Sequence, residues 1–167
     1  MGDLFESKED HGKLGASESP CSDNPCSDSP SGAALSVGNV PQGVVGIGTD
    51  IIECDRIAQM MQKHGETFIQ RVFTAEEIDY CSRHRTADQH YAGRWAAKEA
   101  VLKVLGTGWA KGIQWTDVEV VRDVSGAPSI RLRNRAAEIA AERGIREVLI
   151  SISHCKAFAT AFAVGVR

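Results

Sequence analysis

The chain has 167 residues, of which 43% are hydrophobic and 25% charged, and its net charge at pH 7 is −3. This length and composition suit one globular domain with a hydrophobic core. No apolar run reaches the roughly 18 residues that a membrane-spanning helix needs. The acidic start of the chain, "MGDLFESKED", also differs from a secretory signal, which has an apolar segment. We therefore expect a cytoplasmic protein without a membrane partner.

Residues 1–40 are predicted to be a disordered acidic extension. They carry seven acidic and two basic side chains, and they include the Ser-, Pro- and Cys-rich stretch "SESPCSDNPCSDSPSG". Such a segment buries too little apolar surface to offset the entropy cost of ordering. Cys21 and Cys26 are not expected to bind a metal because no second Cys or His pair lies nearby. Cys54, Cys81 and Cys155 are expected to be reduced thiols.

Residues 41–167 are predicted to form the folded domain. They carry 15 acidic and 17 basic side chains, so this part of the chain is mildly basic. A small positive excess suits an acidic partner or a phosphorylated ligand.

The folded part begins with one strand followed by three helices. The stretch "GVVGIGTDIIE" (43–53) has the β-branched, glycine-punctuated composition of a buried strand. Apolar residues then recur at helical spacing, with Asp55 as the candidate N-cap. A second helix should begin at Thr74, which forms a capping box with Glu77. A longer third helix should run over 87–105 and end at a glycine.

The remainder of the chain predicts four strands and one further helix. The strands are expected at 117–123, 129–133, 147–153 and 158–164, and the helix at 134–144. The order β-α-α-α-β-β-α-β-β indicates an α+β domain with a mostly antiparallel sheet packed with the long helix.

The long third helix carries four charges close to its apolar face. At about 100° per residue, the apolar stripe consists of Tyr91, Trp95, Leu102 and Leu105. Glu99 and Lys103 lie on one edge of it, and Arg94 and Lys98 on the other. One interpretation is a surface pair between Glu99 and Lys103 worth a few tenths of a kcal/mol, with Arg94 and Lys98 reaching to solvent. The other is a set of charges that borders a binding site.

Asp50 lies inside the apolar first strand, where an isolated carboxylate would be costly to desolvate. Backbone amides or a buried arginine could satisfy it. Alternatively, Asp50 and Glu99, with Lys103 one turn beyond, would be a minimal set for holding a hard divalent cation against a diphosphate. Mg²⁺ prefers a few protein oxygens and completes its shell with water and substrate phosphates.

These residues resemble the signature of a known family. Asp50 in "IGTD" and, after an interval of 44 residues, "WAAKEAVLK" (95–103) are similar to the two-part signature of the 4'-phosphopantetheinyl transferases. The compact size resembles the holo-[acyl-carrier-protein] synthase branch. The resemblance continues through "GTG" and the C-terminal "SISH", and it covers about residues 43–165. By contrast, "GVVGIG" lacks the dinucleotide-binding glycine pattern, and "GTGWAKG" does not fit a phosphate-binding P-loop.

The resemblance implies a reaction and roles for individual residues. The phosphopantetheine arm of coenzyme A, the co-substrate, would be transferred to a serine of an apo acyl carrier protein, with release of adenosine 3',5'-bisphosphate. Asp50 and Glu99 would be the Mg²⁺ ligands, and Lys103 would stabilise charge on the phosphate or leaving group. Whether Glu99 or a metal-bound water accepts the serine proton stays open.

The resemblance also implies a coenzyme A site. Arg94, His154, Gly106 and Gly108 match positions near coenzyme A, and an arginine suits the geometry of a phosphate. Without the resemblance, His154 would more simply be a hydrogen-bonded surface or core histidine.

Carrier binding is assigned to the first helix. Arg56, Gln59 and Lys63 form a short basic stripe that could steer an acidic carrier, and Arg56 and Met60 match carrier-contacting positions. The alternative is a solvated helix face. The resemblance further implies a homotrimer with the active site between protomers, and no nucleic-acid partner. An inactive module that binds a carrier protein or coenzyme A is the alternative function, but the presence of both carboxylates and Lys103 favours an enzyme.

Overall fold

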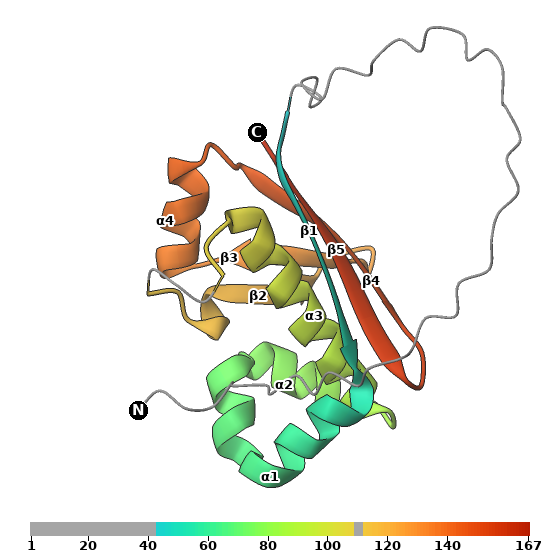
Figure 1. Cartoon of the computed structure of the whole chain (residues 1–167). Helices are drawn as coiled ribbons and strands as arrows, with labels where there is room; N and C mark the ends of the chain where they lie inside the picture. Colours follow the sequence, from blue (N-terminus) through green and yellow to red (C-terminus); the bar gives the residue numbers. More distant parts are fainter. Residues whose placement is uncertain (1–42, 109–111) are drawn as a thin grey trace, which may run out of the picture. The chain divides into compact units, whose positions relative to one another are not determined.

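The computed structural model describes residues 43–108 and 112–167, so the predicted extension at 1–40 lies outside the described part. The elements follow the predicted order, with one short 3-10 helix in addition (Figure 1). They are β1 (Val44–Glu53), α1 (Cys54–Val72), α2 (Ala75–Ser82), α3 (Ala87–Leu105), η1 (Trp115–Asp117), β2 (Val118–Arg122), β3 (Pro128–Leu132), α4 (Asn134–Glu142), β4 (Glu147–His154) and β5 (Phe158–Val166).

The strands form two antiparallel sheets. The larger sheet has the order β1-β5-β4, and β2 pairs with β3 in a hairpin. The prediction of an α+β domain with antiparallel strands is confirmed, while the division into two sheets was not foreseen. Asp50 on β1 lies opposite Ala161 on the central strand β5. The long helix α3 packs against all three strands of the larger sheet and also contacts α1, α2 and β2 (Figure 1).

The central position of α3 makes it buried on nearly every side. From Tyr91 to Leu105, every residue is buried except Glu99 and Lys103. A helix surrounded by other elements needs no polar face. The interpretation in which Arg94 and Lys98 reach to solvent is therefore wrong, because Arg94 is 7% exposed and Lys98 is fully buried.

Two glycines of β1 allow the close approach of α3. A Cβ atom at Gly46 would lie 2.9 Å from the carbonyl oxygen of Val104, and one at Gly48 would overlap the carbonyl oxygen of Ala100. Since both neighbours are backbone atoms, a side chain at either position would push the helix away from the strand. The glycines in "GVVGIGTD" thus bring the chain around Asp50 directly beneath α3.

The N-termini of α1 and α2 test two predicted helix caps. The capping box of α2 is confirmed, since the Thr74 amide donates to Glu77 at 2.8 Å and the Glu77 amide donates to the Thr74 hydroxyl at 3.3 Å. The prediction of Asp55 as the N-cap of α1 is wrong. Glu53 occupies that position without a side-chain cap, and Asp55 lies in the first turn, where its charge favours the helix dipole.

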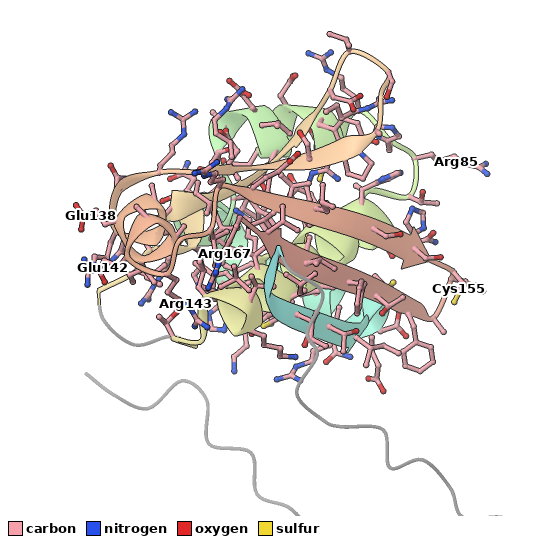
Figure 2. The ribbon with its side chains drawn as sticks, turned by 90° about the horizontal axis from the view of Figure 1, so that it is seen from above. Arg85, Glu138, Glu142, Arg143, Cys155 and Arg167 are labelled. Carbon is pink, nitrogen blue, oxygen red and sulfur yellow. The ribbon has the colours of Figure 1, made fainter. Side chains whose placement is uncertain are left out.

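The core combines aromatic and small residues. Trp95 stacks on Phe68 of α1 with ring centroids 5.9 Å apart and contacts Trp115 of η1 at 4.4 Å. Phe73 packs on Tyr91 at 4.9 Å. Cys54, Cys81 and Cys155 are free cysteines, and the exposed Cys155 lies at the β4–β5 turn (Figure 2). None of the helices in the described ranges is long and apolar enough to cross a membrane.

Candidate active site

Asp50 and Lys103 form an ion pair between β1 and α3. The Lys103 Nζ atom lies 2.9 Å from Asp50 Oδ1 and also donates to the carbonyl oxygen of Thr49 at 2.6 Å. The Asp50 side chain is only 17% exposed, whereas that of Lys103 is 48% exposed. The donor that this strand carboxylate needs is therefore a lysine, and neither of the two donors considered above, a backbone amide or a buried arginine, is required.

Glu99 lies one helical turn before Lys103 and is half-buried. Residues four apart on a helix share a face, so Glu99 and Lys103 lie on the part of α3 that is not covered. In the described ranges, no group of three or more His, Cys, Asp and Glu residues is arranged to hold a metal. A site built on Asp50 and Glu99 would supply two hard oxygen ligands, which suits Mg²⁺ when water and phosphate complete its shell.

A second set of polar side chains lines a pocket of about 140 Å³ between α2, α3, the β2–β3 hairpin and β4. Two of the predicted residues, Arg94 and His154, line this pocket. Its other lining residues are Tyr80, His90, Gly93, Val120, Arg122, Gly126, Pro128 and Ile152. The structure thus brings together two residues that are 60 positions apart in the sequence.

Arg94 lines this pocket and is held in place by an aromatic ring. Its guanidinium carbon lies 3.9 Å from the ring centroid of Tyr80, and that of Arg122 lies 5.4 Å from the same centroid. The buried Nε atom of Arg94 has no hydrogen-bond partner within the described part of the chain. This N–H is shielded from solvent, whereas Arg94 as a residue lines the pocket, and a guanidinium group suits an anion such as phosphate.

The rings of three histidines contact one another here, and two of them, His90 and His154, line this pocket. The ring centroids of His84 and His90 are 4.0 Å apart, and those of His90 and His154 are 5.1 Å apart. Burial, together with the neighbouring His84, His154 and Arg94, lowers the pKa of His90 to about 4. His90 is therefore neutral at pH 7, and a bound anion would favour its protonation.

Sequence reasoning missed Tyr80, His90 and Arg122. His90 could have been found, because it lies four residues before Arg94 on the same helix and so shares its face. Tyr80 and Arg122 had no such signal, since α2 and the hairpin reach the pocket only through tertiary packing.

Gly106 and Gly108 form the turn after α3. Gly106 is the C-cap with a φ of 61°, and a Cβ atom there would collide with the Arg143 guanidinium. Arg143, which Figure 2 labels, in turn donates to the carbonyl oxygen of Leu105 at 2.7 Å. Gly108 has a φ of 51°. The positive φ angles explain why glycine occupies both positions. Contact of these two glycines with coenzyme A stays a prediction.

The predicted carrier-binding residues lie on α1 but differ in burial. Arg56 and Lys63 are exposed, whereas Met60 is partly buried and packs against the core. Arg56 also lines a depression of about 340 Å³ together with Ile51, Ile52, Glu53 and Phe158. Exposed positive charge beside an apolar depression suits a protein partner.

The structure thus holds a strand carboxylate paired with a helix lysine and a pocket lined by Arg94, Arg122, His90 and His154, called the cationic pocket below. The sequence model of the 4'-phosphopantetheinyl transferase superfamily matches residues 46–163. Holo-[acyl-carrier-protein] synthase from Rhodopirellula baltica is 45% identical over 121 residues, which are 72% of this chain and 96% of that protein. The chain belongs to this superfamily, in its holo-[acyl-carrier-protein] synthase branch.

Solved structures agree with this family. Holo-[acyl-carrier-protein] synthase from Neisseria meningitidis has a TM-score of 0.69 and 31% identity, covering 74% of this chain and 99% of that one. The Helicobacter pylori enzyme, solved in complex with coenzyme A, has a TM-score of 0.63 and 30% identity, covering 71% of this chain and 98% of that one.

Proposed function

We propose that this protein transfers the 4'-phosphopantetheine arm of coenzyme A to a serine hydroxyl of an apo acyl carrier protein. The products are the holo carrier and adenosine 3',5'-bisphosphate. The observation that carries the proposal is the Asp50–Lys103 ion pair, one helical turn from Glu99, in a fold of this family. The names of the relatives and the coenzyme A complex of one of them support the same reaction.

Asp50 and Glu99 would hold Mg²⁺ and Lys103 would contact the diphosphate. The ion, when bound, neutralises charge on the diphosphate. The Lys103 ammonium, 48% exposed and anchored on Asp50 and Thr49, can donate to a diphosphate oxygen and stabilise charge that develops on the leaving group. Glu99 is one candidate to accept the serine proton, with a water as the other.

The cationic pocket would bind a further phosphate of coenzyme A. Arg94, Arg122, His90 and His154 all line it, and guanidinium groups bind phosphate well. Arg94 and Glu99 are five residues apart on α3, which corresponds to a rise of about 7.5 Å. They also differ by about 140° around the helix, so a ligand with two separated phosphate groups, as in coenzyme A, would have to extend around α3 to contact both sites.

The outer face of the larger sheet would join copies of this chain. Ile47, Ile51, Leu149, Phe158 and Phe162 are between 45% and 67% exposed. Successive side chains of a strand point to opposite faces of the sheet. Gly48 and Ile52 are buried on the face that α3 covers, so Ile47 and Ile51 point to the other face. An apolar patch of this kind is uncommon on monomers. We expect a homotrimer in which neighbouring protomers share the active site.

The protein partner would be an acidic acyl carrier protein of fatty acid synthesis, in the cytoplasm. The exposed Arg56 and Lys63 on α1 would steer this carrier. An inactive module that only binds carrier or coenzyme A remains the second candidate, because the cationic pocket and basic helix would serve it equally. The paired carboxylates and Lys103 favour the enzyme.

Mass spectrometry of a purified apo carrier separates the two candidates. After incubation with this protein, coenzyme A and Mg²⁺, the carrier serine should gain one phosphopantetheine, and adenosine 3',5'-bisphosphate should appear in equal amount. Binding of carrier or coenzyme A without either product would support the inactive module.

A further inference from the structure

Lys98 is a lysine without exposed surface in the middle of α3. Its Nζ atom lies 2.8 Å from Glu77 Oε2, and both side chains are 0% exposed. Lysine and glutamate are among the residues least often buried. Removing two charges from water is expensive even when they pair, so this pair is costly unless both groups are fully hydrogen-bonded.

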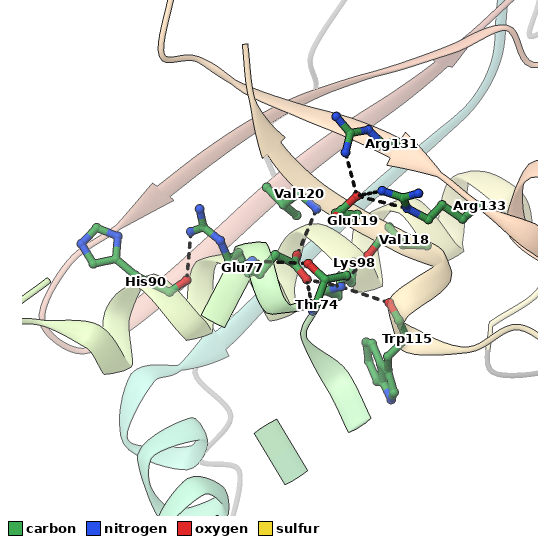
Figure 3. A network of polar contacts seen from close by, with 11 residues as sticks. Thr74, Glu77, His90, Lys98, Trp115, Val118, Glu119, Val120, Arg131 and Arg133 are labelled. Carbon is green, nitrogen blue, oxygen red and sulfur yellow. Dashed lines mark hydrogen bonds and ion pairs between the residues drawn. The ribbon is translucent and has the colours of Figure 1, made fainter. Parts of the chain in front are cut away.

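All polar atoms of the pair have partners (Figure 3). Besides Glu77, the Lys98 ammonium donates to the carbonyl oxygens of Trp115, at 3.0 Å, and Val118. These three acceptors match the three donors of an ammonium. The Glu77 Oε1 atom accepts from the amide of Val120 at 3.0 Å, and Oε2 also accepts from the amide of Thr74.

The pair therefore joins four elements at one point. Glu77 belongs to the capping box of α2, Lys98 to α3, and the accepting carbonyls to η1 and β2. Burial lowers the pKa of Lys98, and the charge of Glu77 acts in the opposite direction. Such a pair gives directional contacts that apolar packing lacks.

Lys98 and Glu99 are adjacent, so their side chains diverge by about 100° around the helix. Lys98 is fixed on α2 and β2, while Lys103 reaches Asp50 on β1. A helix with its side chains has a radius of about 5–6 Å, so a rotation of α3 by about 10° would move the end of a side chain by about 1 Å. A displacement of this size in an active site can cost about 100-fold in rate.

We propose that Glu77 and Lys98 are a positioning pair that sets the rotation of α3 and thereby places Glu99 and Lys103 relative to Asp50. The inference rests on the proposed transfer reaction. A role in stability alone explains the pair less well, because apolar residues of similar volume in place of a buried ion pair are often neutral or stabilising.

The test compares the wild type with the double variant Glu77→Gln/Lys98→Met. This variant removes both charges together, keeps a residue that can form a capping box at position 77, and leaves no unpaired buried charge. We expect a folded protein whose kcat for transfer is about 30-fold lower, while KM for coenzyme A changes less than about threefold. The Mg²⁺ concentration for half-maximal rate should rise.

The control is Ile139→Ala, a core truncation in α4 at a residue that is 3% exposed. It should lower Tm without lowering kcat per folded molecule. A crystal structure of the double variant should show α3 turned relative to β1. Wild-type kcat in the double variant, or an unchanged α3, would overturn the inference while the transfer reaction stands. An inactive wild type would instead overturn the proposed function.

Discussion

Gly48 on β1 lies directly beneath the backbone of α3 at Ala100, so closely that a methyl group at position 48 would overlap the Ala100 carbonyl oxygen. The same hypothetical Cβ would lie 3.0 Å from the Cβ atom of Lys103. The distance between strand and helix, and with it the Asp50–Lys103 ion pair, depends on this contact.

Gly48→Ala should therefore reduce both stability and transfer. The clashing atom belongs to the backbone, so α3 and β1 must separate, and we expect a loss of about 1–3 kcal/mol or more. Urea unfolding and transfer kinetics measure the two effects. Gly46→Ala should cost less, since its Cβ would lie 2.9 Å from the Val104 carbonyl oxygen. If both alanine variants kept the stability and transfer rate of the wild type, the close approach of α3 to β1 would not be required.

Asp50→Asn and Glu99→Gln should each lower kcat by at least about 100-fold while leaving the fold intact. The Asp50–Lys103 pair is partly exposed, so its loss should cost at most about 1 kcal/mol of stability. A chelator should abolish transfer by the wild type. Asp79→Asn, which removes an exposed carboxylate paired with Arg83, is the control and should keep full activity. Near-normal turnover in either site variant would remove the metal assignment.

The protein should become less stable as the pH falls from about 6.5 to about 4. The folded-state pKa of His90 is lowered to about 4, whereas an unfolded histidine titrates near about 6.5. In this window the unfolded state binds more protons, so acid favours unfolding. Thermal unfolding of wild type and His90→Gln across this range checks the prediction. The variant should lose stability less steeply, and parallel curves would argue against a lowered pKa of His90.

Wild-type protein should be a trimer by light scattering. Ile51→Glu with Phe162→Glu should yield monomers, because both side chains lie on the exposed apolar face of the larger sheet. Val124→Glu is the matched control: this residue is an exposed hydrophobic on the β2–β3 turn, and its variant should remain trimeric. A wild type that is monomeric and fully active at high dilution would refute the shared site.

Arg56→Glu with Lys63→Glu should raise KM for the carrier and leave KM for coenzyme A nearly unchanged. Both side chains are exposed, so core packing should not be affected. The wild-type carrier affinity should also weaken as salt shortens the Debye length from about 10 Å to about 3 Å. Arg135→Glu with Arg146→Glu, both outside this face, controls for net charge. Equal losses for both substrates would mean that α1 presents only a solvated face.

The sequence by itself determined the features that depend on neighbours within a few residues. The order of strands and helices, the Thr74–Glu77 capping box and the glycine at the end of α3 were all predicted from local patterns and are present. The spacing of Asp50 and the motif around Glu99 also indicated the family, which the comparisons confirmed. The error at Asp55 arises because β1 ends at Glu53 and α1 begins at Cys54, so the strand runs directly into the helix and Asp55 is already inside it.

Only the tertiary structure decided the environment of each charge. Lys98 and Lys103 lie on the same helix in the same motif, yet one is buried against Glu77 and the other is half exposed beside Asp50. Likewise, Arg122 and His90 meet in one pocket only because the β2–β3 hairpin packs beside α3. Burial depends on which elements surround a helix, and those elements come from distant parts of the chain. Helical periodicity reports where a side chain points, but the free-energy cost of a charge depends on what lies there.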